Sequence, residues 1–195
     1  MQQTPSSVSW TFEPAFKRLF RSLCWISLVL FSVPVLGQVQ KGSDGYVMDS
    51  MYVSYFGSGK PRSIAHFKEG LLHGAAWEFH ASGQVLIYNE WLEGQKNGEE
   101  KEFDQVGRLV HVTTWRYGRM HGEERNYYVT SVIQSRIQWV NNQKDGLSVW
   151  YHDNGLPAVE FPYVRGEIHG EGRYYDTEGK LEKTLRYVHN QIIAN

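Results

Sequence analysis

A period of 24 residues runs through the chain from about Tyr46 to residue 195, and it constrains the fold more than any other feature. Glycine, or asparagine in its place, recurs at one phase of this period, at Gly70, Gly94, Gly118, Asn142, Gly166 and Asn190. A second glycine follows four residues later, at Gly74, Gly98, Gly122, Gly146 and Gly170. Such a period is typical of repeat proteins, in which each repeat is one supersecondary unit stacked on its neighbours.

Each period also contains two aromatic positions and a third position that favours glycine. The first aromatic position holds Phe79, Phe103, Tyr127, Tyr151 and Tyr175. The second, which we call the aromatic ladder, consists of Trp91, Trp115, Trp139, Tyr163 and Tyr187. Between the two lie Gly83, Gly107, Ser131, Gly155 and Gly179. Because Ser131 stands where glycine is expected, we expect its loop to be either reshaped or strained.

Each period is expected to form one β-hairpin. In the second period, Trp77 and Phe79 share one parity of segment 75–80, which is the pattern of a strand with one apolar face. Val85, Ile87 and Trp91 do the same in segment 84–92. The segment between two such strands, as in His152-Asp153-Asn154-Gly155, is a hairpin signal. The run Gly70–Gly74 is expected to form the other connection, from one hairpin to the next.

The sequence therefore predicts an all-β fold. We expect an elongated, single-layer antiparallel sheet of about six stacked β-hairpin repeats after an N-terminal signal segment. A single hairpin is barely stable in water, so stacking of the aromatic faces must stabilise the array. The composition agrees, because 14% of the residues are aromatic and 19 are glycine, which favours strands and turns.

Residues 1–37 are predicted to be a secretory signal peptide. Basic residues from Lys17 to Arg21 precede an apolar run from Leu23 to Leu36, and Gly37 follows. The run is shorter than the roughly 20 residues that span a membrane, although an uncleaved N-terminal anchor is the alternative. Residues 38–45 are predicted to be a short linker and residues 46–195 the repeat array. We therefore expect an exported protein of the periplasm, cell envelope or extracellular space.

Several repeats resemble a known family. The unit that begins Gly118-Arg119-Met120-His121-Gly122 and the unit 166–181 resemble MORN-type repeats, most closely the bacterial MORN-variant repeat. The resemblance covers roughly residues 46–195 and implies an elongated sheet of successive hairpins. It also implies roles in scaffolding, protein–protein contact and, in some cases, association with membrane phospholipid. Some members carry the label of antitoxin, a role that fits an exported chain poorly, and the resemblance brings no catalytic residues.

Candidate catalytic and metal-binding residues lack the required spacing. His73, His121 and His169 occupy one position in alternate units, which strand spacing puts about 20 Å apart, so we interpret them as turn residues and not as metal ligands. The adjacent carboxylates Glu99-Glu100 and Glu123-Glu124 are expected to face opposite sides of their strands. We predict no catalytic, cofactor or metal site, and therefore no enzyme. An enzyme with a shallow site on the sheet is the alternative.

The aromatic ladder is the one feature that predicts binding. It is either a packing spine or, where exposed, a surface for a peptide, glycan or lipid. We predict a protein-interaction or scaffold module whose ladder residues Trp91, Trp115, Trp139, Tyr163 and Tyr187 contact a protein partner. The alternatives are a peripheral envelope module that binds lipid or glycan, and an antitoxin-like partner-binding protein. A net charge of −1 with interspersed signs argues against nucleic acid, and the oligomeric state stays open.

Overall fold

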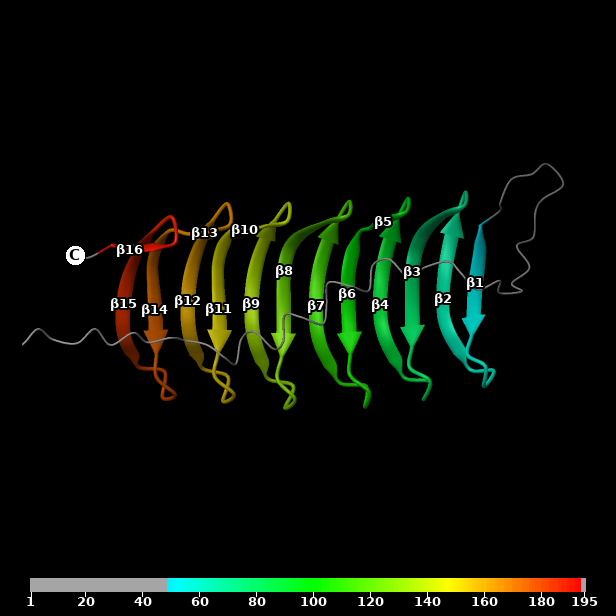
Figure 1. The fold of residues 1–195 in the computed structure, drawn as a ribbon, viewed down its shortest axis with the longest axis horizontal. Coiled ribbons are helices and arrows are strands. Elements are labelled where there is room, and N and C mark those ends of the chain that lie inside the picture. Colours follow the sequence, from blue (N-terminus) through cyan, green and yellow to red (C-terminus); the bar gives the residue numbers. More distant parts are fainter. Residues whose placement is uncertain (1–48, 194–195) are drawn as a thin grey trace, which may run out of the picture. The chain divides into compact units, whose positions relative to one another are not determined.

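The computed structural model describes residues 49–193, so the predicted signal peptide and linker lie outside the described residues. The described part is one open sheet of sixteen antiparallel strands, and it contains no helix (Figure 1). The predicted all-β, single-sheet fold is confirmed. No helix that is long and apolar enough to cross a membrane occurs between residues 49 and 193.

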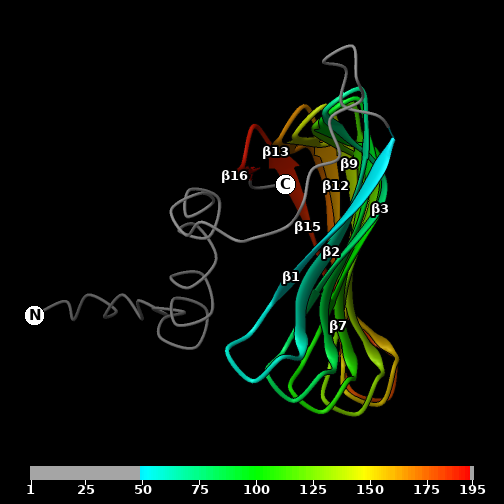
Figure 2. The same cartoon turned by 90° about the vertical axis from the view of Figure 1, so that its right-hand side faces the viewer.

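The strands follow one another through the sheet in the order of the sequence. They are β1 (Ser50–Tyr55), β2 (Pro61–Lys68), β3 (Leu71–Phe79), β4 (Val85–Leu92), β5 (Gln95–Lys96), β6 (Gly98–Phe103), β7 (Leu109–Arg116), β8 (Arg119–Tyr127), β9 (Ile133–Val140), β10 (Gln143–Lys144), β11 (Gly146–Tyr151), β12 (Pro157–Val164), β13 (Glu167–Ile168), β14 (Gly170–Tyr175), β15 (Leu181–Val188) and β16 (Gln191–Ile193). The short strands β5, β10 and β13 pair beside β4, β9 and β12. Viewed from the end of the sheet, the strands are bowed in a common curve (Figure 2).

The long hairpin loops share one backbone conformation. Between β11 and β12, His152 N donates to Leu156 O at 2.8 Å and Gly155 N donates to His152 O at 2.9 Å. Gly155 has a φ of 84°, where a side chain is unfavourable. Ser131, in the loop between β8 and β9, has a φ of 66° and keeps the same pair of hydrogen bonds. Its loop is therefore strained and not reshaped.

The other connections are tight turns of two residues, and their predicted position is wrong. Glu69 and Gly70 have φ angles of 52° and 79°, as in the type I′ turns that match the twist of β-hairpins. The equivalent turns are Glu93-Gly94, Tyr117-Gly118, Asn141-Asn142, Arg165-Gly166 and His189-Asn190. Because β3 begins at Leu71, the segment Gly70–Gly74 lies mostly in a strand. His73 and His121 are thus strand residues in β3 and β8, while His169 lies between β13 and β14.

The aromatic ladder lies on one face of the sheet, which we call the ladder face. Each of its members is directly opposite the second glycine of its repeat, as Trp91 is opposite Gly74 and Tyr187 is opposite Gly170. The same face carries most of the side chains that are buried, namely Asn89, Glu100, Thr113, Ser135, Ile137, Ser148 and Tyr187. Val112 is buried on the opposite face. The core of this single-layer sheet therefore lies along the ladder face.

Candidate functional site

The ladder rings alternate along the sheet with long side chains from the neighbouring strands. Trp91 pairs with Lys96, and Trp139 pairs with Lys144. The corresponding residues beside Trp115, Tyr163 and Tyr187 are Met120, Ile168 and Ile192. No two ladder rings stack on each other within residues 49–193. These interposed side chains escaped the sequence analysis because they share no residue type, although each follows the first turn glycine or asparagine by two positions.

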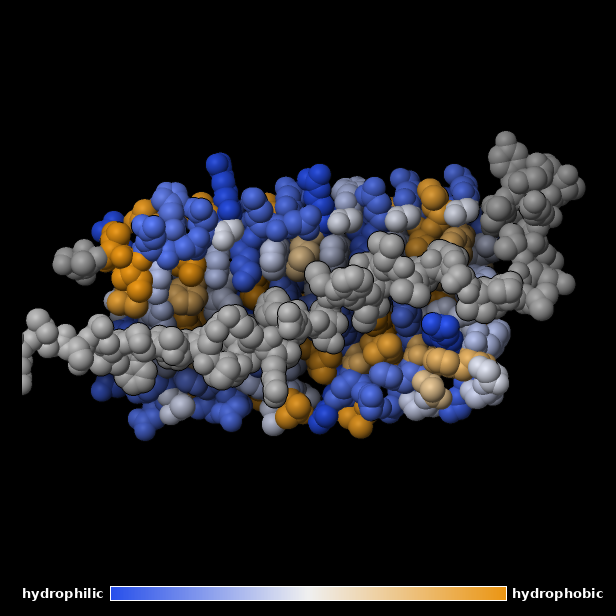
Figure 3. Space-filling model, in the orientation of Figure 1, coloured by the Kyte–Doolittle hydropathy of each residue, from blue (hydrophilic) through white to orange (hydrophobic). Residues whose placement is uncertain are grey.

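The ladder is only partly used in packing. Tyr187 is 7% exposed, whereas the other four ladder residues are partly exposed. On the visible part of the face in Figure 3, hydrophobic groups are separated by hydrophilic residues, and one group lies at the end that carries β15 and β16. Ile192 and Ile193 of β16 are 59% and 38% exposed. The ladder therefore both packs and presents surface, and its role in binding stays a prediction.

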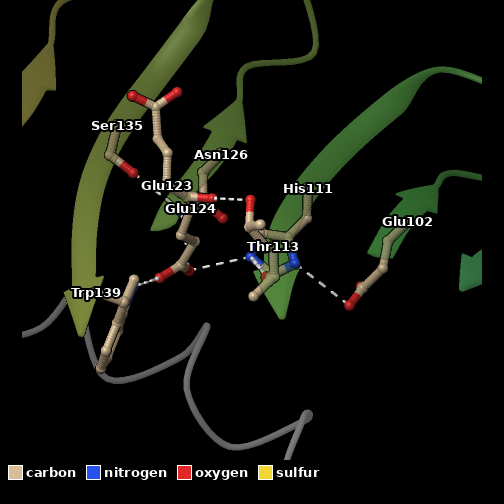
Figure 4. Close-up of polar contacts among 9 residues, drawn as sticks. Glu102, His111, Thr113, Glu123, Glu124, Asn126, Ser135 and Trp139 are labelled. Carbon is tan, nitrogen blue, oxygen red and sulfur yellow. Dashed lines mark hydrogen bonds and ion pairs between the residues drawn. The ribbon is translucent and has the colours of Figure 1, made fainter. Parts of the chain in front are cut away.

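A polar cluster occupies the middle of the ladder face, where four strands each contribute one residue (Figure 4). His111 of β7 donates from Nδ1 to Glu102 Oε1 of β6 at 3.3 Å and from Nε2 to Glu124 Oε1 of β8 at 3.0 Å. Trp139 of β9 donates from Nε1 to the other oxygen of Glu124 at 2.7 Å. A ladder indole is therefore fixed by a carboxylate that also holds the imidazole. We call Glu102, His111, Glu124 and Trp139 the polar cluster.

Neighbouring side chains complete the hydrogen bonding of this cluster. Thr113 Oγ1 lies 3.1 Å from His111 Nε2, and Asn126 Nδ2 donates to Ser135 Oγ at 3.0 Å (Figure 4). Thr113 and Ser135 are almost fully buried. Most buried polar groups in proteins are hydrogen-bonded, and this network fixes the positions of its side chains.

The charges of the polar cluster are set by its geometry. Burial alone lowers the pKa of His111, but hydrogen bonds and charge from Glu102 and Glu124 outweigh it and raise this pKa to about 9. The hydrogen bond from His111 lowers the pKa of Glu102. Burial raises the pKa of Glu124, yet the bonds from His111 and Trp139 lower it overall. At neutral pH the cluster thus holds an imidazolium between two carboxylates, and a protonated ring cannot act as a general base.

An aromatic cluster occupies the ladder face near its C-terminal end. Phe161 of β12 is its centre, with ring centroids 5.8 Å from Trp150, 5.7 Å from Tyr174 and 5.5 Å from Tyr187. All three contacts are edge to face, which is a favourable geometry for aromatic pairs. The hydroxyls of Tyr174 and Tyr187 lie 2.7 Å apart and share a hydrogen bond. We call Trp150, Phe161, Tyr174 and Tyr187 the aromatic cluster.

The opposite face of the sheet carries surface ion pairs. Arg125 lies 3.3 Å from Glu99 and 3.4 Å from Glu123, and Arg136 lies 2.7 Å from Glu123. Glu99 and Glu123 are on this face, while Glu100 and Glu124 are on the ladder face, as strand alternation predicts. Exposed pairs of this kind contribute little stability each. Within residues 49–193, no group of three or more His, Cys, Asp and Glu side chains is arranged to hold a metal ion.

These features define a class of protein: an open-sheet repeat protein built from consecutive β-hairpins, with one packed face. Residues 168–189, which cover β14 and β15, match the family model described as MORN repeat variant. This match identifies residues 168–189 as a MORN-type repeat and supports the resemblance of the chain to MORN-type repeat proteins. No curated protein sequence matches this chain.

Two solved structures resemble parts of the chain. One is described as the crystal structure of TarM, with a TM-score of 0.33, 12% identity, and coverage of 45% of this chain and 17% of that chain. The other is the accessory secretory protein 1, 2 and 3 structure of Streptococcus pneumoniae, with a TM-score of 0.33, 16% identity, and coverage of 58% and 21%. The chain therefore spans about a fifth of each of those longer chains.

Proposed function

We propose that this protein is an exported scaffold that binds a protein partner on its ladder face. The observation that carries the proposal is the row of partly exposed rings at Trp91, Trp115, Trp139 and Tyr163. Aromatic side chains dominate the energetics of protein interfaces because they bury a large area with few rotatable bonds. The polar cluster adds hydrogen-bonding groups to the same face. Aromatic surface and hydrogen-bonding groups, which are both typical of protein interfaces, therefore lie on one face.

The two faces of the sheet differ in what they offer to a partner. A partner on the opposite face would have to desolvate ion pairs such as Arg136–Glu123, and this cost offsets the gain from contact. On the ladder face the strands bury part of each ring in advance, so little side-chain entropy is lost on binding. This difference favours the ladder face.

The proposal includes no catalytic step. His111 donates both of its ring N–H groups to carboxylates, so its imidazole has no free nitrogen that could accept a proton. The proposed export rests on the order of basic, apolar and small residues between Lys17 and Gly37. Fractionation of the native cells tests the location, and recovery in the cytoplasm alone would contradict it.

Site-specific photo-crosslinking tests the binding proposal. A benzoylphenylalanine replaces Tyr163 on the ladder face or, as a matched control, Tyr88 on the opposite face, in the full chain within its native cells. We expect a discrete protein adduct from position 163 and none from position 88. Equal adducts from both positions, or only lipid or glycan adducts from position 163, would contradict the proposal.

A further inference from the structure

Lys144 of β10 is held among three aromatic rings. Its Nζ lies 5.2 Å from the ring centroid of Tyr163 and 5.8 Å from those of Trp139 and Trp150. Aromatic faces attract an ammonium, and the attraction grows as water is removed. Within residues 49–193, however, Lys144 Nζ forms no ion pair or side-chain hydrogen bond. Its positive charge is therefore oriented but not neutralised.

The same position two repeats earlier shows the contact that Lys144 lacks. Lys96 lies 48 residues before Lys144, and its Nζ is 4.9 Å from the ring of Trp115. In addition, Lys96 forms an ion pair with Glu100, which is 8% exposed. The repeat thus has room for a carboxylate beside this lysine, close to the ladder ring.

Ser148 occupies the position in the later repeat that corresponds to Glu100. It lies on the ladder face, fully buried, and its Oγ has no hydrogen-bond partner among the residues that the structure describes. Serine is too short to place an oxygen where the Glu100 carboxylate lies, and a hydroxyl does not neutralise a lysine. An unpaired hydroxyl and an unpaired ammonium therefore occur where the earlier repeat has a complete ion pair, and each marks a missing polar partner.

We propose that Lys144 binds a carboxylate from an acidic segment of the partner protein, which neutralises Lys144 as Glu100 neutralises Lys96. This inference rests on the proposed function, since it names the chemistry of the partner. A single ammonium suits a single carboxylate. Phosphate groups favour the bidentate fork of arginine, and the strand register puts Arg125, Arg136 and Arg173 on the opposite face.

Fluorescence anisotropy with a matched pair of peptides tests this inference. The probes are a fluorescein-labelled peptide with glutamate at alternate positions and its glutamine counterpart, with the purified full chain as receptor. We expect the acidic peptide to bind at least about 10-fold more tightly, which corresponds to the loss of one partly buried ion pair. Lys144→Met, which keeps the apolar stem, should abolish this preference.

Two further variants distinguish a specific contact at Lys144 from nonspecific charge attraction to the peptide. Ser148→Glu should also abolish the preference, because an internal carboxylate then neutralises Lys144 as Glu100 neutralises Lys96. Lys96→Met is the control and should keep the preference within about twofold. Thermal melting confirms that each variant is folded, and Lys144→Met alone decides the outcome if Ser148→Glu does not fold.

Three results would overturn the inference. They are equal binding of the two peptides to the wild-type protein, an undiminished preference in Lys144→Met, and Lys144-dependent binding to phosphatidylserine vesicles without binding to the acidic peptide. The crosslinking at position 163 distinguishes failure of the carboxylate site at Lys144 from failure of the proposed function. If the protein adduct persists unchanged in Lys144→Met, the scaffold function stands and the carboxylate site does not.

Discussion

The polar cluster and the aromatic cluster lie in corresponding parts of the repeat, 48 residues apart, yet they stabilise the sheet by different forces. Trp150 stands at the position of Glu102, and Phe161 at that of Thr113. The backbone register around both clusters is the same, with Glu100 opposite Thr113 and Ser148 opposite Phe161. The repeat therefore specifies the strands and turns, while the side chains of the ladder face vary.

Gly172 shows how the sheet accommodates aromatic side chains in place of the polar ones. Gly172 stands where the polar cluster has Glu124. A Cβ added at Gly172 would lie 2.8 Å from ring atoms of both Phe161 and Tyr187, so only glycine lets these rings approach. In the polar cluster, the longer Glu124 fills the equivalent space and receives the hydrogen bonds of His111 and Trp139. Glycine at this position makes room for the aromatic cluster, whereas glutamate at the equivalent position belongs to the polar cluster.

Truncation at the centre of the aromatic cluster should have the largest effect. Phe161→Ala removes three edge-to-face contacts and should lower the free energy of unfolding by about 2–4 kcal/mol, since Phe161 is partly exposed. Thr113→Ala, the matched change beside the polar cluster, should cost about 1 kcal/mol. Urea denaturation measures both, and equal losses would mean that the two clusters do not differ as described.

The polar cluster should make stability depend on pH between 6.5 and 9. Because the pKa of His111 rises from 6.5 to about 9 on folding, its contribution is complete below pH 6.5 and is lost as pH rises through 9. We expect a loss of about 2–3 kcal/mol over this range. The lowered pKa values of Glu102 and Glu124 give contributions that are present above their ordinary 4.5 and lost at lower pH.

His111→Gln should remove this dependence. Urea denaturation at a series of pH values measures it, and NMR titration of the imidazole gives the pKa directly. His189→Gln is the control, because the His189 side chain is 70% exposed and lies outside the cluster. A slope that persists in His111→Gln would assign the pH dependence to other groups.

A single methyl group should open the aromatic cluster. Gly172→Ala places a Cβ against the rings of Phe161 and Tyr187 and should cost about 2 kcal/mol by overpacking. The near-ultraviolet circular dichroism of the aromatic rings should change as well. Gly57→Ala is the control, since nothing lies within 4 Å of an added Cβ there. An unchanged spectrum and stability in Gly172→Ala would show that the rings have free room.

The smallest effect concerns the hairpin loops beside the two clusters. Ser131→Gly should stabilise the loop between β8 and β9 by about 0.5–1 kcal/mol, because it relieves a non-glycine residue with a φ of 66°. The reciprocal change Gly155→Ser, in the loop between β11 and β12, should destabilise by a similar amount. Melting temperatures measure both, and changes of the same sign would contradict the shared loop geometry.

The period and the residue alternation were sufficient to predict the hairpins, the order of strands and a common face for the ladder. The two-residue turns were misplaced because residues such as Glu69 and Tyr117 carry no sequence signal for a left-handed backbone, which the twist of the flanking strands imposes on them. The polar cluster was missed for a related reason. Glu102, His111 and Glu124 are 9 and 13 residues apart, and only the strand register brings them together.

The order of strands has a consequence for how this protein gains and loses its structure. Every strand between residues 50 and 193 pairs only with strands that are near it in sequence, so no segment has to wait for a distant one before it can form. Folding can therefore start at any hairpin and extend to the neighbouring hairpins on both sides. Amide hydrogen exchange should accordingly be slowest in β7 to β9, at the middle of the array, and faster toward β1 and β16.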